Sequence, residues 1–162
     1  MKILIFGLPG TGKTTLAEPL AKLIKGVHVT GTQIRKKYEG HDKSNWDFSE
    51  QGRLKQAYWM KHISDGIELA ERVAVIDFVC PTVEMREIIN ADFTIWMDTT
   101  NGSLYKDTLK MFQPPKQKTD VDYHVAQWFD DTHTQLVPII DRWMRLNDCT
   151  PIAYISYKMG LV

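Results

Sequence analysis

The chain has 162 residues, enough to bury the core of one domain, so we expect a single domain over residues 1–162. Its 20 basic and 20 acidic side chains cancel, which argues against a nucleic-acid partner because proteins that bind nucleic acids usually carry a basic excess. No apolar stretch approaches the roughly 20 residues of a membrane span, and the two cysteines and five histidines show neither disulfide nor metal-ligand spacing. We expect a cytoplasmic protein with no membrane partner. The sequence leaves the oligomeric state open and is compatible with a homodimer.

The first predicted elements are a strand, a glycine-rich loop and a helix. Residues 3–6 form the apolar run that is typical of a buried parallel strand. Leu16, Leu20 and Leu23 recur further on at helical spacing. Between them, residues 7–14 read GLPGTGKT, which fits the phosphate-binding pattern G-x-x-x-x-G-K-[ST] in the strand–loop–helix context that the pattern requires.

This pattern predicts a site for ATP and Mg²⁺. Glycines let several backbone N–H groups point into one concavity, and the start of the helix adds partial positive charge. We expect Lys13 to reach the β- and γ-phosphates as a catalytic residue and the Thr14 hydroxyl to hold Mg²⁺. The residues expected to bind ATP are Gly7, Leu8, Pro9, Gly10, Thr11, Gly12, Lys13, Thr14 and Thr15.

Strands and helices are predicted to alternate along the rest of the chain. Further strands are expected over residues 27–29, 73–76, 93–97 and 121–125, with a small terminal strand over 152–155. Further helices are expected over 30–38, from Ser49 to about Ala70, over 82–90 and over 129–146, the last kinked or divided by Pro138. This alternation predicts an α/β fold with a doubly wound parallel sheet of about five strands, flanked by helices.

Ligands of such sheets bind beyond the carboxyl ends of the strands, where two features of this sequence lie. Asp77 ends the predicted strand 73–76, a position suited to a carboxylate that organises Mg²⁺ or takes a proton from an acceptor hydroxyl; the structural alternative is a cap of the next turn. Residues 99–120 show little buried pattern beyond a short helix at 103–111 and carry Lys106, Lys110, Lys116 and Lys118. We expect this segment to form a lid whose lysines offset phosphoryl charge, the alternative being a solvated loop.

Several motifs resemble those of the adenylyl-sulfate kinase (APS kinase) family, whose members have a P-loop NTPase-type fold and use MgATP to phosphorylate the 3′-hydroxyl of adenosine 5′-phosphosulfate. The resemblance rests on the loop at 7–15, TGTQIR at 30–35, FSEQGR at 48–53 and FVCP at 78–81. It is clearest over residues 1–98 and faint after about 115.

The resemblance implies that Arg35 and Arg53 contact the phosphosulfate of the acceptor and that Phe48 stacks on its adenine. Arginine binds such oxyanions in a fork geometry, and a phenylalanine in a polar loop gains from a stacked partner. The structural alternatives are surface ion pairs for the two arginines and a place in the core for Phe48. By the same resemblance, Phe112 would be a second stacking residue, although the alignment there is loose.

The sequence also departs from the family. Thr30 and Thr32 replace the two aspartates of its D-G-D motif, and threonine cannot take up a proton at neutral pH; Asp77 is therefore the replacement that we expect. Cys80 stands where the family has a serine.

The first hypothesis for the function is an APS kinase-like phosphotransferase. The alternatives are a kinase for a nucleoside, nucleotide or polynucleotide 5′-end, or a nucleotide-binding module without phosphotransfer.

Overall fold

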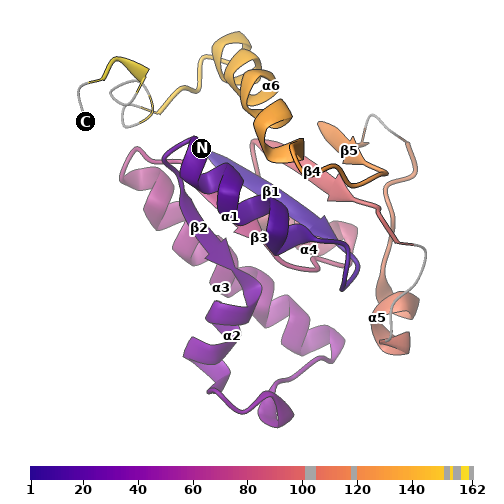
Figure 1. Ribbon diagram of the computed structural model, residues 1–162. Helices are drawn as coiled ribbons and strands as arrows, with labels where there is room; N and C mark the ends of the chain where they lie inside the picture. The colour runs from indigo at the N-terminus through magenta and orange to yellow at the C-terminus, as the bar shows by residue number, and fades with distance from the viewer. Residues whose placement is uncertain (101–104, 118–119, 152–153, 155–157, 161–162) are drawn as a thin grey trace.

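A computed structural model describes residues 1–100, 105–117, 120–151, 154 and 158–160, and strands and helices alternate along it (Figure 1). The strands are β1 (Lys2–Gly7), β2 (Val27–Thr30), β3 (Ala74–Asp77), β4 (Phe93–Met97) and β5 (Tyr123–Val125). The helices are α1 (Lys13–Leu23), α2 (Gly31–Glu39), α3 (Glu50–Leu69), α4 (Val83–Ile89), α5 (Lys106–Met111) and α6 (Thr132–Leu146), with a short 3₁₀ helix, η1 (Lys43–Asn45).

The five strands form one parallel sheet in the order β2-β3-β1-β4-β5. In the central strand β1, Ile3 and Ile5 belong to one core cluster, and Leu4 and Phe6 belong to another. All four side chains are fully buried, because successive side chains of a strand point to opposite faces and helices cover both faces. This double burial explains the uninterrupted apolar run at the start of the chain.

The helices form a layer on each side of the sheet. Leu16 and Leu20 of α1 pack with Ile140 of α6 in the first core cluster, and Met60 of α3 packs with Met85 of α4 in the second. Figure 1 shows α1 in front of the sheet and α3 and α4 behind it. Because the strands are parallel, the residues that follow their carboxyl ends meet at one edge of the sheet, which positions the site.

The predicted fold class is confirmed: the chain forms a doubly wound, parallel α/β sheet of five strands flanked by helices. Ser49 caps α3 as expected, because its side chain accepts a hydrogen bond from the Gly52 N–H at 3.2 Å. Pro138 lies inside a continuous α6 and does not divide it. No helix in the described ranges is both long and apolar enough to cross a membrane.

Several predicted boundaries differ from the structure. The helix expected over 129–146 begins at Thr132. β5 begins at Tyr123 rather than at residue 121. The helix expected over 103–111 begins at Lys106, and residues 103–104 lie outside the described part of the chain. The terminal strand expected over 152–155 also falls mostly outside it, and the prediction is wrong at Tyr154, which is helical. The Tyr154 N–H donates to the Pro151 carbonyl oxygen at 3.0 Å, and its side chain is buried in the first core cluster.

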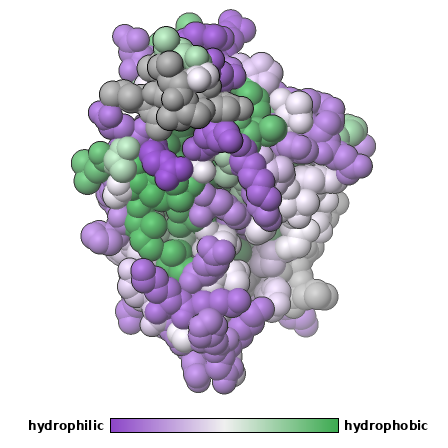
Figure 2. Space-filling model, turned by 60° about the vertical axis from the view of Figure 1, so that its left-hand side comes forward, coloured by the Kyte–Doolittle hydropathy of each residue, from purple (hydrophilic) through white to green (hydrophobic). Residues whose placement is uncertain are grey.

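The surface is mainly polar at the end of the molecule that holds α2 and η1. Figure 2 shows hydrophilic side chains over this lower end and hydrophobic side chains gathered higher on the same face. The cavity described below opens near the polar end, between α2, the loop that carries η1, and the start of α3.

Candidate active site

The loop between β1 and α1 adopts a backbone that favours glycine. Gly12 directly precedes α1 and has a φ of 86°, in the left-handed region. Gly7 has a φ of 151°, and a Cβ at this position would lie 2.3 Å from the Met97 carbonyl oxygen. The first turn of α1, which follows this loop, leaves backbone N–H groups without intrahelical partners. A glycine-rich loop before such a helix start is the arrangement that binds phosphate.

The β4–β5 side of the sheet supports this loop from one flank. Thr99, just after β4, donates from Oγ1 to the Thr11 carbonyl oxygen at 2.9 Å. A Cβ at Gly12 would meet ring atoms of Trp128 at 3.6 Å, so the indole lies against the start of α1. The sequence analysis did not identify Thr99 or Trp128, because neither belongs to a motif.

Lys13 places a positive charge in the loop. Its Nζ donates to the Leu8 carbonyl oxygen at 2.7 Å. Burial lowers the pKa of Lys13 to about 8, and the negative charge of Asp77 offsets part of that shift. The ammonium group is therefore poorly solvated and would gain from an anionic partner.

Asp77 and Thr14 form a pair beside Lys13. Asp77 ends β3 with 2 % of its surface exposed, and Thr14 donates from Oγ1 to its Oδ2. A hydroxyl that donates its hydrogen in this way keeps its lone pairs for a cation. Such oxygen ligands suit Mg²⁺, which proteins commonly hold through one or two carboxylates together with substrate phosphates. No cluster of three or more His, Cys, Asp or Glu is found in the described residues that could hold a metal ion.

His28 is a neighbour of Asp77 that the sequence analysis missed. Its Nε2 lies 3.0 Å from Asp77 Oδ1, so each oxygen of this carboxylate has one described donor. β2 and β3 are adjacent, with Thr30 opposite Asp77, and His28 points to the same face as Thr30 because side chains alternate along a strand. The alternation of side chains along β2 indicates the face on which His28 lies, but it predicts the contact with Asp77 only once β2 is known to lie beside β3.

A cavity of about 230 Å³ joins the phosphate loop to α2, α3 and the loop between them. Lys13, Thr14 and Asp77 line one part of it, and the opposite part is lined by three residues that the resemblance singled out, Arg35, Phe48 and Arg53. Thr30 and Thr32, which stand where the resembled family has aspartates, also line this cavity. The structure therefore brings the expected ATP-binding and acceptor-binding residues to one cavity.

The two arginines are buried, with 2 % of Arg35 and 6 % of Arg53 exposed. Arg35 Nη1 donates to Glu39 Oε2 at 2.6 Å and to the Asp47 carbonyl oxygen at 2.8 Å, whereas its buried Nη2 has no hydrogen-bond partner within the described residues. Burial, and secondarily the charge of Arg35, lowers the pKa of Arg53. An unsatisfied buried guanidinium N–H beside a second guanidinium is the arrangement of a site that accepts an oxyanion.

Phe48 covers both arginines. Its ring centroid lies 4.7 Å from Cζ of Arg35 and 5.5 Å from Cζ of Arg53, and the ring lies 6.2 Å from that of Trp46. The Phe48 side chain is nevertheless 48 % exposed. It is therefore neither a core anchor nor free in solvent, and its open face can stack on a planar ligand.

The predicted lid residues lie outside this cavity. Phe112 is partly buried against the second core cluster, and its contact with an acceptor stays a prediction. Lys106, Lys110 and Lys116 are exposed, and Lys118 lies outside the described residues. The residue of α5 that reaches the arginines is Thr108, whose Oγ1 accepts from Arg53 Nη2 at 2.6 Å. No spacing in the sequence indicates this contact, because it joins two segments 55 residues apart.

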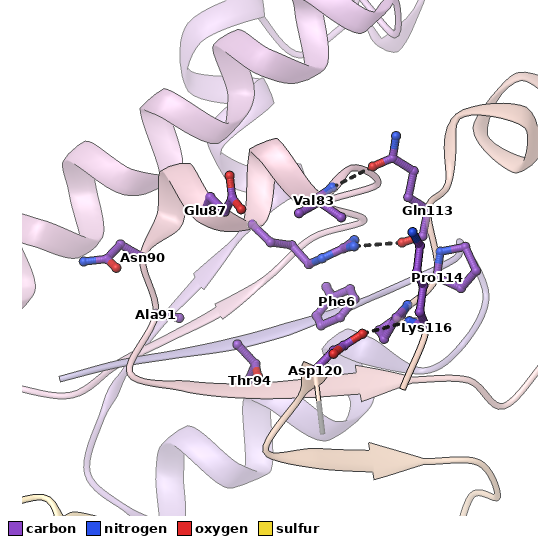
Figure 3. A pocket seen from close by; sticks show the side chains of 12 residues that line it. Phe6, Val83, Glu87, Asn90, Ala91, Thr94, Gln113, Pro114, Lys116 and Asp120 are labelled. Atoms are coloured by element: carbon purple, nitrogen blue, oxygen red, sulfur yellow. Dashed lines mark hydrogen bonds between the residues drawn. The ribbon is translucent and has the colours of Figure 1, made fainter. Parts of the chain in front are cut away.

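A larger cavity lies elsewhere in the described structure. It measures about 870 Å³ and lies between α4, β4 and the segment at 113–116. Figure 3 shows Phe6 in its floor, with Val83 on one side and Gln113 on the other. None of the side chains that surround the phosphate loop lines it. We therefore place the site by its chemistry rather than by its size.

Comparisons with known proteins agree with this architecture. A model of the family described as ATPases associated with various cellular activities (AAA) matches residues 3–53, which is less than half of the chain and includes the phosphate loop. No curated protein matches the sequence.

Solved structures of several kinases share the fold. The APS kinase CysC of Mycobacterium tuberculosis, in complex with AMPPNP and APS, has a TM-score of 0.66 and 15 % identity over 86 % of this chain and 96 % of that one. A sugar kinase from Janibacter sp. HTCC2649 has a TM-score of 0.62 and 14 % identity over 89 % and 94 %. Shikimate kinase from Aquifex aeolicus has a TM-score of 0.58 and 14 % identity over 90 % and 99 %.

These likenesses define the class of fold: the chain has a P-loop kinase-like fold. Enzymes with different acceptors share that fold at similar TM-scores. The fold alone therefore does not specify a function for this chain.

Proposed function

We propose that this chain is an ATP-dependent small-molecule kinase that transfers the γ-phosphate of ATP to a hydroxyl group of an anionic acceptor. The first candidate acceptor is adenosine 5′-phosphosulfate, phosphorylated on its 3′-hydroxyl. The observation that carries the proposal is the buried Arg35, which lines the same cavity as Lys13 and whose Nη2 has no hydrogen-bond partner among the described residues. Such a donor costs stability unless a ligand accepts from it.

The other cavity residues support the same class of acceptor. Arg35 and Arg53 together match the tetrahedral oxyanion of a sulfate or phosphate group. The half-exposed ring of Phe48 offers a surface for a planar base. An acceptor that carries both an oxyanion and a base, as adenosine 5′-phosphosulfate does, would engage all three residues.

The mechanism follows from where the residues lie. Lys13 and the loop N–H groups bind the triphosphate and offset its charge, and Arg35 and Arg53 orient the acceptor hydroxyl for in-line attack. Asp77 and Thr14 would hold Mg²⁺, which when bound neutralises charge on the β- and γ-phosphates. Catalysis of phosphoryl transfer comes mainly from positioning and charge stabilisation, so the absence of carboxyl groups from Thr30 and Thr32 does not exclude it.

The test is an assay of purified protein with MgATP and a panel of acceptors: adenosine 5′-phosphosulfate, AMP, shikimate and gluconate. We expect ADP release that depends on adenosine 5′-phosphosulfate, with a product one phosphate heavier by mass spectrometry. Arg35→Met should abolish this transfer and leave the affinity for an ATP analogue unchanged. Transfer to another acceptor would reassign the substrate, and failure to bind ATP would overturn the proposal.

One observation favours a second candidate, a nucleotide-binding module without phosphotransfer. Among the described residues that line the cavity, Asp77 is the sole carboxylate, because Thr30 and Thr32 occupy the positions of the family's aspartates. In this case the protein would bind ATP tightly and release no ADP with any acceptor. Asp77→Asn would then change nucleotide affinity but no catalytic rate.

A further inference from the structure

We propose that His28 is a positioning residue that fixes Asp77 for the binding of Mg²⁺ with ATP. This inference rests on the proposed function, because it concerns the same nucleotide site. His28 lies on β2, outside the glycine-rich loop and outside the cavity lining. Any effect of His28 on the nucleotide site would therefore pass through its hydrogen-bond partner, Asp77.

The direction of the hydrogen bond follows from the chemistry of the pair. An ionised carboxylate can accept but cannot donate, so the Nε2 of His28, 3.0 Å from Oδ1, is the donor. Thr14 donates to the other oxygen, Oδ2. Asp77 is thus held between two donors, one from β2 and one from the phosphate loop.

This arrangement restricts how the carboxylate can rotate. With 2 % of Asp77 exposed, water is a poor substitute for a lost donor at Oδ1. Removing the ring of His28 would leave that oxygen unpaired and the side chain free to turn away from Thr14. Partners that orient a metal ligand typically change metal affinity by about 10- to 100-fold.

A second pair in the same structure provides a matched control. His124 of β5 places its Nε2 3.0 Å from Oδ2 of Asp98, which follows β4. Its side chain is 21 % exposed, compared with 19 % for His28. The two histidines therefore match in hydrogen-bond distance and exposure, whereas the Asp98 side chain is 37 % exposed and the Asp77 side chain 2 %. Only the pair that contains Asp77 contacts Thr14. Substitution of His124 reports the general effect of losing such a pair.

The experiment measures the binding of a fluorescent, non-hydrolysable ATP analogue, first without Mg²⁺ and then as Mg²⁺ is added. In His28→Leu we expect unchanged affinity for the analogue without Mg²⁺. The Mg²⁺ concentration that gives half of the Mg²⁺-dependent change in analogue binding should rise about 10-fold or more. His28→Gln, whose amide can donate to Oδ1, should restore the wild-type Mg²⁺ dependence. His124→Leu should leave both measurements unchanged.

The outcomes separate this inference from the proposed function. A wild-type protein that does not bind the analogue would overturn the proposed function. A wild-type protein that binds it, with His28→Leu showing the same Mg²⁺ dependence, would overturn the role of His28 alone. So would an equal shift in His28→Leu and His28→Gln, or the same shift in His124→Leu. If His28→Leu does not fold, His28→Asn replaces it with the same expectation, because the shorter amide does not reach Oδ1.

Discussion

Lys13 shows how a single side chain can be prepared for a ligand. In the free protein its ammonium group donates to a carbonyl of its own loop, Leu8 O, and burial lowers its pKa to about 8. A carbonyl oxygen carries only a partial charge, so a phosphate is the better partner. The charge of Lys13 is therefore the part of the proposed site that a bound phosphate would stabilise most directly.

The first residue-scale prediction concerns pH. Negative phosphate charge raises the pKa of Lys13 in the complex, so above pH 8 the free protein must take up a proton in order to bind. We therefore expect the affinity for ATP to fall as the pH rises above about 8, and Lys13→Met to bind about 10- to 100-fold more weakly and without this pH dependence. Calorimetry from pH 6.5 to about 9.5 measures the affinity of both proteins. If the affinity of the variant fell with pH as steeply as that of the wild type, a group other than Lys13 would account for the pH dependence.

The second residue-scale prediction concerns the two free cysteines. Cys80 is fully buried and Cys149 is half-buried, and burial raises the pKa of both thiols. Because the thiolate is the reactive form, we expect N-ethylmaleimide to modify Cys149 first and Cys80 only after unfolding. Mass spectrometry of native and urea-treated samples gives the order. Equal labelling in the native protein would contradict it.

At the scale of elements, α5 is fastened to the acceptor side of the site. Arg53 of α3 donates to Thr108 of α5 at 2.6 Å, and both side chains are buried. Further along, the Gln113 N–H donates to the Pro81 carbonyl oxygen at 2.8 Å, and Gln113 Oε1 accepts from the Val83 N–H at 2.9 Å. The segment that was predicted to be a lid is thus attached to the phosphate loop through Thr99, to α3 through Thr108, and to the start of α4 through Gln113.

The prediction at this scale concerns Thr108. Thr108→Val keeps the shape of the side chain but leaves a buried guanidinium N–H unpaired, which should lower the free energy of unfolding by about 1–3 kcal/mol. Amide hydrogen exchange over α5 should also become faster. Thr108→Ser keeps the hydroxyl and should behave like the wild type. Urea unfolding and hydrogen exchange measure the two effects, and identical behaviour of the valine and serine variants would show that the bond does not hold α5.

At the scale of the whole molecule, the sequence patterns predicted the sheet well because they are local. The apolar run of β1, the loop motif and the cap at Ser49 each depend on residues close together in the chain. The motif at 48–53 likewise led to Phe48 and Arg53, which lie together with Arg35 in the structure.

What the sequence did not reveal depends on contacts between distant segments. His28 meets Asp77 only because β2 pairs with β3, and Thr108 meets Arg53 only because α5 packs beside α3. The terminal strand was predicted wrongly at Tyr154 for a related reason. Its apolar neighbours indicated an extended sheet segment, but Tyr154 packs against α6 and the first core cluster instead.

The strand order has a consequence for how this protein could diversify. The arginines and Phe48 belong to segments on the β2–β3 side of β1, whereas Thr99 and Trp128 support the phosphate loop from the β4–β5 side. Mutations on the first side can therefore accumulate without disturbing the support on the second. Under the proposed function, Thr30 and Thr32 lie on the first side, so substitutions at these positions would alter the proposed acceptor site and leave the support of the phosphate loop intact.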